Sequence, residues 1–213
     1  MNIDILVQAR LGSRRFPRKV LAEVAGVPLI RYLLDGMKRA TQARHVVALV
    51  PYMDKELISA VFPFPVWVGD EHDVAGRFVD YCERSDCDGF VRVCGDSPVL
   101  DWRIVNDMIC IFRETSAFLV SNVDGGFPAG QHCEVVDRRF FLRWKYKLDR
   151  EHVTPTLYAV AGSLLWPWST EAPSEKPSMT VDCPDDLVRM ARVIERADFK
   201  PWERRWRENQ CFA

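Results

Sequence analysis

Several common features are missing from this chain of 213 residues, and each absence argues against a class of protein. The seven cysteines include no CxxC pair, and an odd number does not suit a secreted disulfide framework. The longest stretch without a charged residue, 153–170, contains Pro155, Gly162 and Pro167, which argues against a membrane span. The first residues show no basic segment followed by an apolar one, so we expect no signal peptide and a cytoplasmic location.

An excess of charge of either sign is also missing. Lys and Arg number 29 and Asp and Glu number 30, so the net charge is −1. A nearly neutral chain has no global basic field for nucleic acid or an anionic membrane, and any anion site must be local. The chain is 48% apolar and 28% charged, as globular proteins usually are, and its length predicts a single domain over residues 1–213.

Short apolar runs alternate with amphipathic segments along the chain. We expect strands at residues 3–7, 45–50, 66–68, 89–94, 118–121, 134–136 and 178–181. We expect helices at residues 28–40, 54–61, 73–83, 101–112, 137–147 and 184–196, a helix start within 150–158 and a helical tail at 201–207. Asp101 is expected to cap the helix that it opens. This alternation predicts an α/β fold of three layers, with a mostly parallel sheet between two layers of helices.

In an open parallel sheet the ligand lies outside the carboxyl ends of the strands. Residues 8–19 follow the first expected strand and hold five cations, together with Gly12 and Ser13. Glycine allows a tight turn, and arginine and lysine suit phosphate oxygens, so the segment predicts a phosphate-binding loop. It matches neither the Walker pattern nor the GxGxxG dinucleotide pattern, and a solvated basic loop is the alternative.

Two aspartates follow expected strands at the same edge of the sheet. Asp96 comes two residues after the strand at 89–94, and Asp182 directly follows residues 178–181. Two carboxylates beside a polyphosphate site are natural Mg²⁺ ligands and suggest metal-assisted nucleotidyl transfer. Each aspartate could instead form a turn or cap a helix.

Several motifs occur in the order found in one family. Residues 9–19 resemble the A-R-x-x-S-x-R-x-P-x-K motif of the cytidylyltransferases that make CMP-activated sugar acids. Residues 95–98 resemble their G-D-x-P metal motif, and residues 181–187 resemble their V-D-T-P-E-D-L motif. Residues 69–77 and 150–155 are similar to motifs of the spore-coat polysaccharide biosynthesis protein F-like branch.

This resemblance implies a nucleotide-diphospho-sugar transferase fold, which is similar to that of the glycosyltransferase-A enzymes. It implies a homodimer that transfers CMP from CTP to a hydroxyl of a 2-keto-3-deoxy sugar acid, with Mg²⁺ and release of pyrophosphate, for surface polysaccharide or glycan synthesis. The less regular part around residues 123–180 would serve the acceptor and dimerisation. The alternatives are a sugar nucleotidyltransferase that uses another NTP, a glycosyltransferase that uses a nucleotide sugar, and a nucleotide-binding subunit without catalysis.

The resemblance also implies roles for individual residues. The residues implied in nucleotide binding are Ala9, Arg10, Leu11, Gly12, Ser13, Arg15, Lys19, Asp73, Arg77 and Asp96. Those implied in catalysis are Arg10, Arg15, Lys19, Asp96 and Asp182, with Asp96 and Asp182 as the Mg²⁺ ligands. Those implied in binding the acceptor are Asn122, Gln131, His132, Glu134, Arg150 and His152.

Two positions depart from the family's pattern. Arg18 stands where the family usually has glycine before the lysine, and His132 stands where the branch has aspartate. Arg18 could alter the phosphate contacts or point to solvent. His132 could change the acceptor that is bound, act as a base on its hydroxyl, or be purely structural.

Overall fold

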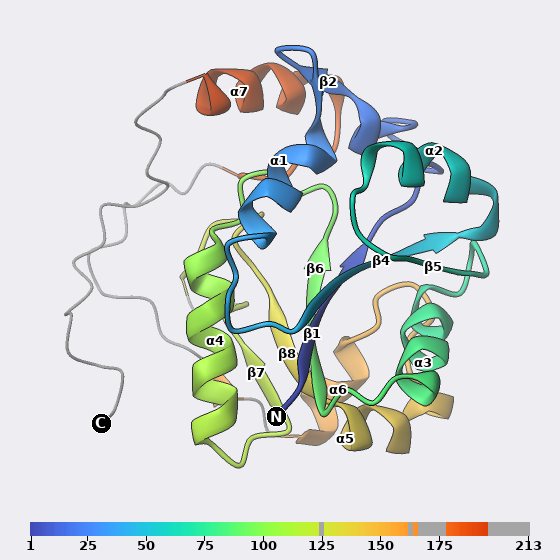
Figure 1. The fold of residues 1–213 in the computed structure, drawn as a ribbon, viewed down its shortest axis with the longest axis vertical. Coiled ribbons are helices and arrows are strands. Elements are labelled where there is room, and N and C mark those ends of the chain that lie inside the picture. The colour runs from blue at the N-terminus through green and yellow to red at the C-terminus, as the bar shows by residue number, and fades with distance from the viewer. Residues whose placement is uncertain (124–125, 162–163, 166–177, 196–213) are drawn as a thin grey trace.

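The computed structural model describes residues 1–123, 126–161, 164–165 and 178–195 (Figure 1). In this part of the chain the main sheet has seven strands in the order β5-β4-β1-β6-β8-β7-β9. The strands are β1 (Ile3–Gln8), β4 (His45–Pro51), β5 (Val66–Gly69), β6 (Gly89–Cys94), β7 (Leu119–Ser121), β8 (Glu134–Asp137) and β9 (Leu164–Leu165). Only β8 among them runs antiparallel to its neighbours, so the expected mostly parallel sheet is confirmed.

Helices cover both faces of this sheet (Figure 1). The helices on one face are α1 (Leu29–Met37), α2 (Lys55–Val61) and α4 (Trp102–Glu114), and those on the other are α3 (Val74–Arg84), α5 (Arg138–Arg143) and α6 (Pro155–Ala161). A last helix, α7 (Pro184–Ile194), packs beside the small hairpin of β2 (Glu23–Val24) and β3 (Val27–Pro28). The expected three-layer α/β/α architecture is confirmed.

The alternation of side chains along β1 explains why helices cover both faces of the sheet. Ile3, Ile5 and Val7 pack with the helices of one face, whereas Leu6 packs with those of the other. All four side chains are fully buried, as a central strand requires. The expected cap is also confirmed, because the side chain of Asp101 accepts a hydrogen bond from the Arg103 amide at 2.9 Å.

Some elements differ from the sequence-based expectation. Residues 178–181 form no strand, because the amides of Met179 and Val181 donate to carbonyls in two loops and not to a neighbouring strand. The apolar side chains of these residues pack under α7. The helix expected at 28–40 ends at Met37, where tight turns follow. The helix expected at 137–147 divides into α5 and a 3₁₀ turn, Lys145–Lys147. The expected tail helix, 201–207, lies outside the described residues.

A buried ion pair ties β1 to the elements around it. The side chain of Asp4 is fully buried and accepts hydrogen bonds from Arg44 Nε at 3.0 Å, Arg44 Nη2 at 2.8 Å and the Tyr81 hydroxyl at 2.8 Å. These contacts join the strand, the segment before β4, and helix α3. Burial, then the hydrogen bond to Asp4, raises the pKa of Tyr81 well above its usual value, so the phenol stays a donor.

We expect Asp4→Ala to lower the free energy of unfolding by about 3 kcal/mol, because it leaves the Arg44 guanidinium and the Tyr81 hydroxyl without their buried acceptor. Urea unfolding followed by circular dichroism measures this change. The control is Asp35→Ala, which removes a carboxylate from an exposed pair with Lys38 and should leave the midpoint unchanged. Equal midpoints for the two variants would contradict the role given to Asp4.

Candidate active site

Three segments far apart in the sequence meet at the carboxyl edge of the sheet. Lys19 follows the loop after β1, Asp96 follows β6, and Asp182 precedes α7. The Lys19 ammonium donates to Asp96 Oδ2 at 2.6 Å and to Asp182 Oδ1 at 2.9 Å. Asp182 Oδ1 also lies 2.9 Å from Arg15 Nη2. The structure therefore brings the two aspartates and two of the cations from the basic loop into one cluster.

The cluster keeps the Lys19 ammonium protonated. Burial by itself lowers the pKa of Lys19, but the charges and hydrogen bonds of Asp96 and Asp182 outweigh burial and leave the pKa above its usual value. The side chain of Lys19 is 13% exposed, so its charge is only partly screened by solvent. The cluster holds two negative and two positive charges.

Buried side chains and backbone hydrogen bonds hold the basic loop in place. Ala9 and Leu11 are buried, and the Leu11 amide donates to Asp54 Oδ2 at 2.7 Å. The Leu11 carbonyl accepts from the amides of Ser13 and Arg18, which closes a tight turn. Arg18 adopts the left-handed conformation, with φ of 59°, and its side chain is exposed. A glycine would take this conformation without strain.

A second group of site residues lies on the α3 side of the sheet. Arg10 Nη2 is 3.2 Å from Glu151 Oε1, so the basic loop also contacts the segment before α6. A side-chain carbon at Gly12 would lie 2.9 Å from Glu71 Oε1, which shows how closely the loop approaches residues 69–77. Asp73, in that segment, caps α3 by accepting from the Gly76 amide at 2.7 Å.

Arg77 is the least ordinary side chain of this group. It is 2% exposed, and its three guanidinium nitrogens have no hydrogen-bond acceptor among the residues that the structure describes. Its stem lies against Gly69, where a side-chain carbon would come within 2.8 Å of Arg77 Cγ. Burial and the charge of Arg10 lower the pKa of Arg77 to about 10, so the guanidinium remains charged at neutral pH. A buried cation without an acceptor is suited to an incoming anion or carbonyl oxygen.

Two of the residues implied in acceptor binding make buried hydrogen bonds to the backbone. The Asn122 and Gln131 side chains are fully buried, and Asn122 Nδ2 donates to the Gln131 carbonyl at 2.7 Å. Gln131 Nε2 donates to the Val99 carbonyl at 2.7 Å, and its Oε1 accepts from the Asp101 amide at 3.0 Å. Both amides are thus engaged by the protein's own backbone.

Glu134 anchors a buried polar network on the same side. Its carboxylate accepts from Arg92 Nη1 at 3.1 and 3.3 Å, from Thr154 Oγ1 at 3.1 Å and from the Tyr158 hydroxyl at 3.3 Å. Ser121 Oγ shares a hydrogen bond of 2.5 Å with the Tyr158 hydroxyl. Sequence reasoning missed Arg92, Thr154 and Tyr158. An arginine inside an otherwise apolar strand was the available signal for the first of them.

The remaining implied acceptor residues lie nearer the surface. His132 Nε2 lies 2.9 Å from the Phe127 carbonyl oxygen and must donate the hydrogen bond there. Arg150 and His152 are exposed, and Asp149 Oδ1 accepts from the amides of Glu151 and His152. Arg150 and His152 therefore remain accessible to a molecule bound at this edge.

A glycine holds the segment that carries Asp182. Gly130 has φ of +89°, and a side-chain carbon there would lie within 2.5 Å of the Met179 carbonyl oxygen. The Met179 amide donates to the Ala129 carbonyl at 2.6 Å, and the Val181 amide donates to the Asp96 carbonyl at 3.0 Å. This close backbone packing places the two carboxylates side by side.

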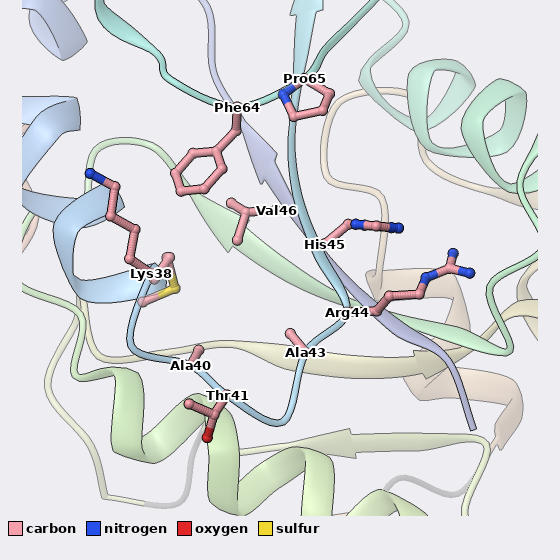
Figure 2. A pocket seen from close by; sticks show the side chains of 10 residues that line it. Lys38, Ala40, Thr41, Ala43, Arg44, His45, Val46, Phe64 and Pro65 are labelled. Atoms are coloured by element: carbon pink, nitrogen blue, oxygen red, sulfur yellow. The ribbon is translucent and has the colours of Figure 1, made fainter.

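The structure also has a hollow at the opposite end of β4, shown in Figure 2. Lys38, Arg44 and His45 contribute to its lining. Lys38 pairs with Asp35, and Arg44 pairs with Asp4 and Asp86, so these two cations are balanced within the protein. None of the residues implied in nucleotide, metal or acceptor binding lines this hollow.

Over the described residues, no helix combines the length and apolar character needed to cross a membrane.

The fold is that of the nucleotide-diphospho-sugar transferases, as two solved structures show. A cytidylyltransferase from Leptospira borgpetersenii superimposes with a TM-score of 0.83 and 23% identity, over 91% of this chain and 87% of that one. A CMP:2-keto-3-deoxy-manno-octonic acid synthetase complexed with CTP superimposes with a TM-score of 0.71 and 14% identity, over 91% and 98% of the two chains. At these identities the likeness concerns the fold alone.

The chain belongs to the cytidylyltransferase family, whose sequence profile matches residues 5–163. The 3-deoxy-manno-octulosonate cytidylyltransferase of Trichlorobacter lovleyi is 31% identical over 111 residues, which are 51% of this chain and 44% of that protein. The match thus spans less than half the length of that relative. The family expected from the motifs is confirmed.

We expect Gly130→Ala to lower activity and stability together, because the new methyl group would push Met179, and with it Asp182, away from Asp96. Steady-state kinetics and thermal unfolding measure the two effects. The matched control is Gly26→Ala, at a position with φ of +74° and nothing within 4 Å of the added carbon. It carries the same backbone cost and should lower stability by about 1 kcal/mol while leaving activity intact. Equal loss of activity in both variants would contradict a specific role for Gly130.

Proposed function

We propose that the protein transfers CMP from CTP to a hydroxyl of a sugar acid of the 2-keto-3-deoxy type, with Mg²⁺ and release of pyrophosphate. The observation that carries the proposal is the pair of carboxylates, Asp96 and Asp182, held by Lys19 at the carboxyl edge of a cytidylyltransferase fold. Transfer from a triphosphate depends on positioning and on neutralising charge, and this cluster offers both.

The carboxylate pair fits a magnesium ion. Both carboxylates have an oxygen within 2.9 Å of one nitrogen atom, so a small movement of the side chains would let both contact a single cation. Among the described residues no three His, Cys, Asp or Glu side chains form a metal site. This suits Mg²⁺, which usually takes one or two carboxylates and completes its shell with phosphate oxygens and water. When bound, Mg²⁺ would neutralise charge on the reacting phosphate and help to ionise the acceptor hydroxyl.

The nucleotide would lie along the basic loop. Arg10, Arg15 and Lys19 supply charge for the triphosphate, and Gly12 lets the backbone come close to it. The backbone around Ala9, Leu11 and Ser13 shapes the loop, because the first two side chains are buried in the core. Asp73 and Arg77 complete the nucleotide site from α3. The buried Arg77 guanidinium supports this assignment, since it needs an acceptor.

The acceptor would bind over β6 and β8. His132, Arg150 and His152 are proposed to contact it, since each keeps a polar group available. Asn122, Gln131 and Glu134 are proposed to position that surface from below, because their polar atoms are engaged inside the protein.

The setting of the enzyme is proposed on separate grounds. A cytoplasmic location is proposed from the odd number of cysteines and the lack of a CxxC pair in the sequence. A homodimer and a role in surface polysaccharide or glycan synthesis are proposed from the motifs shared with the family.

The reaction is tested by pyrophosphate release with CTP, Mg²⁺ and a panel of 2-keto-3-deoxy sugar acids. We expect turnover with CTP, and a loss of at least a hundredfold in Asp96→Asn and in Asp182→Asn, because each leaves one carboxylate for the metal. The control Asp35→Asn removes an exposed carboxylate and should keep full activity. Turnover with another NTP would change the base. Sugar transfer from a nucleotide sugar without pyrophosphate release would replace the proposal by a glycosyltransferase.

We expect Arg77→Met to stabilise the free protein and to abolish its response to CTP. Methionine fills similar space without a buried guanidinium that lacks a hydrogen-bond acceptor among the described residues, so the free energy of unfolding should rise by about 1 kcal/mol or more. The rise in melting temperature on adding CTP should disappear. Thermal unfolding with and without CTP measures both effects. The control Arg143→Met, at an exposed position on α5, should change neither. A destabilised Arg77→Met with an intact CTP response would contradict the assignment.

A further inference from the structure

We infer that Lys19 is a placeholder for the divalent cation, which makes metal binding depend on the nucleotide. Its ammonium occupies the position between Asp96 and Asp182 that the metal must take. The inference rests on the proposed function, because it concerns the metal that the function requires. It adds that this chain excludes the metal from the empty site by means of its own lysine.

The first argument is the geometry around the ammonium. Lys19 Nζ contacts Asp96 Oδ2 at 2.6 Å and Asp182 Oδ1 at 2.9 Å, one oxygen from each carboxylate. A magnesium ion binds oxygens at about 2.1 Å, so an ion held by both carboxylates would lie at or next to the position of the ammonium, where the two cations repel each other. The ammonium and the ion cannot both lie between the carboxylates. Lys19 must therefore leave before the metal enters.

The second argument is the balance of charge. Asp96 and Asp182 carry two negative charges, and Lys19 and Arg15 carry two positive charges. A divalent cation would meet a neutral cluster while both basic side chains stay in place. A nucleoside triphosphate changes this balance, because its phosphates supply negative charge that both the metal and Lys19 can bind.

The third argument is the freedom of the lysine side chain compared with its backbone. The Lys19 amide donates to the Phe16 carbonyl at 3.2 Å, and the Lys19 carbonyl accepts from the Ala22 amide at 3.1 Å. The backbone is thus held in its 3₁₀ turn, and only the flexible side chain needs to move. It can turn from the carboxylates to a phosphate of the bound nucleotide without rearrangement of the loop.

Nucleotide and metal should therefore bind cooperatively. A triphosphate that takes Lys19 off the carboxylates raises the affinity for the metal, and the bound metal must raise the affinity for the nucleotide by the same factor. While the site is empty, Lys19 also keeps Asp96 and Asp182 together, which would otherwise repel each other.

The test uses Mn²⁺ as the probe and the full chain without nucleotide or acceptor. We expect electron paramagnetic resonance titration to show weak Mn²⁺ binding by the unmodified protein. Lys19→Met should bind Mn²⁺ at least tenfold more tightly, because the two carboxylates then face each other with only Arg15 to balance them. Lys19→Arg retains the charge and should bind as weakly as the unmodified protein. Adding Asp96→Asn to Lys19→Met should remove the gain and so locate the ion at this pair.

Thermal unfolding gives a second readout. MnCl₂ should raise the melting temperature of Lys19→Met and leave that of the unmodified protein nearly unchanged. Lys38→Met removes the same charge from an exposed helix end and should behave like the unmodified protein. If Lys19→Met does not fold, Lys19→Ala serves the same purpose with a shorter side chain.

Either of two results would overturn the inference. One is Mn²⁺ binding by Lys19→Met that is no tighter than that of the unmodified protein. The other is equally tight binding by Lys19→Arg and Lys19→Met, which would show that charge at residue 19 is irrelevant. Since neither measurement uses CTP or a sugar acid, a protein that transfers no CMP could still confirm the lysine's role. An active enzyme without this effect would refute the placeholder and leave the proposed function standing.

Discussion

The parallel register of β1 with its two neighbours is the constraint on which the site depends. Gln8, the last residue of β1, lies beside Leu49 of β4 and Cys94 of β6, so these strands end at the same edge. The basic loop and the loop carrying Asp96 must therefore emerge next to each other. The third part, which carries Asp182, is not a strand of this sheet, and backbone packing at Gly130 together with hydrogen bonds brings it there.

Two cations at this edge differ in whether the described residues supply hydrogen-bond acceptors for them. Lys19 is fully paired within the protein, and its partners are the carboxylates proposed to bind metal. Arg77 is buried with no hydrogen-bond acceptor in the described part of the chain, which costs stability unless a ligand supplies one. In the first case the ligand must displace an internal contact, and in the second it completes a missing one.

The polar residues on the proposed acceptor side fall into buried and exposed groups. Asn122, Gln131 and Glu134 are buried and hydrogen-bonded, and they shape the surface that lies over them. Arg150 and His152 are exposed at that surface. A motif marks both kinds of residue alike, because it records which residues occur and not which atoms remain free. Only the contacts distinguish a residue that can touch an acceptor from one that positions its neighbours.

The sequence by itself determined the layered fold, most element boundaries and the family, because apolar periodicity and short motifs are local properties. It also placed Asp96 and the basic loop after buried strands. It could not decide that Lys19 lies between Asp96 and Asp182, since that contact joins residues more than 160 positions apart. It likewise assigned residues 178–181 to a strand, because their extended apolar pattern is the same whether they pair in a sheet or pack under α7. Tertiary structure alone decided which polar atoms are free and which are satisfied, because burial and long-range hydrogen bonds depend on the assembled chain.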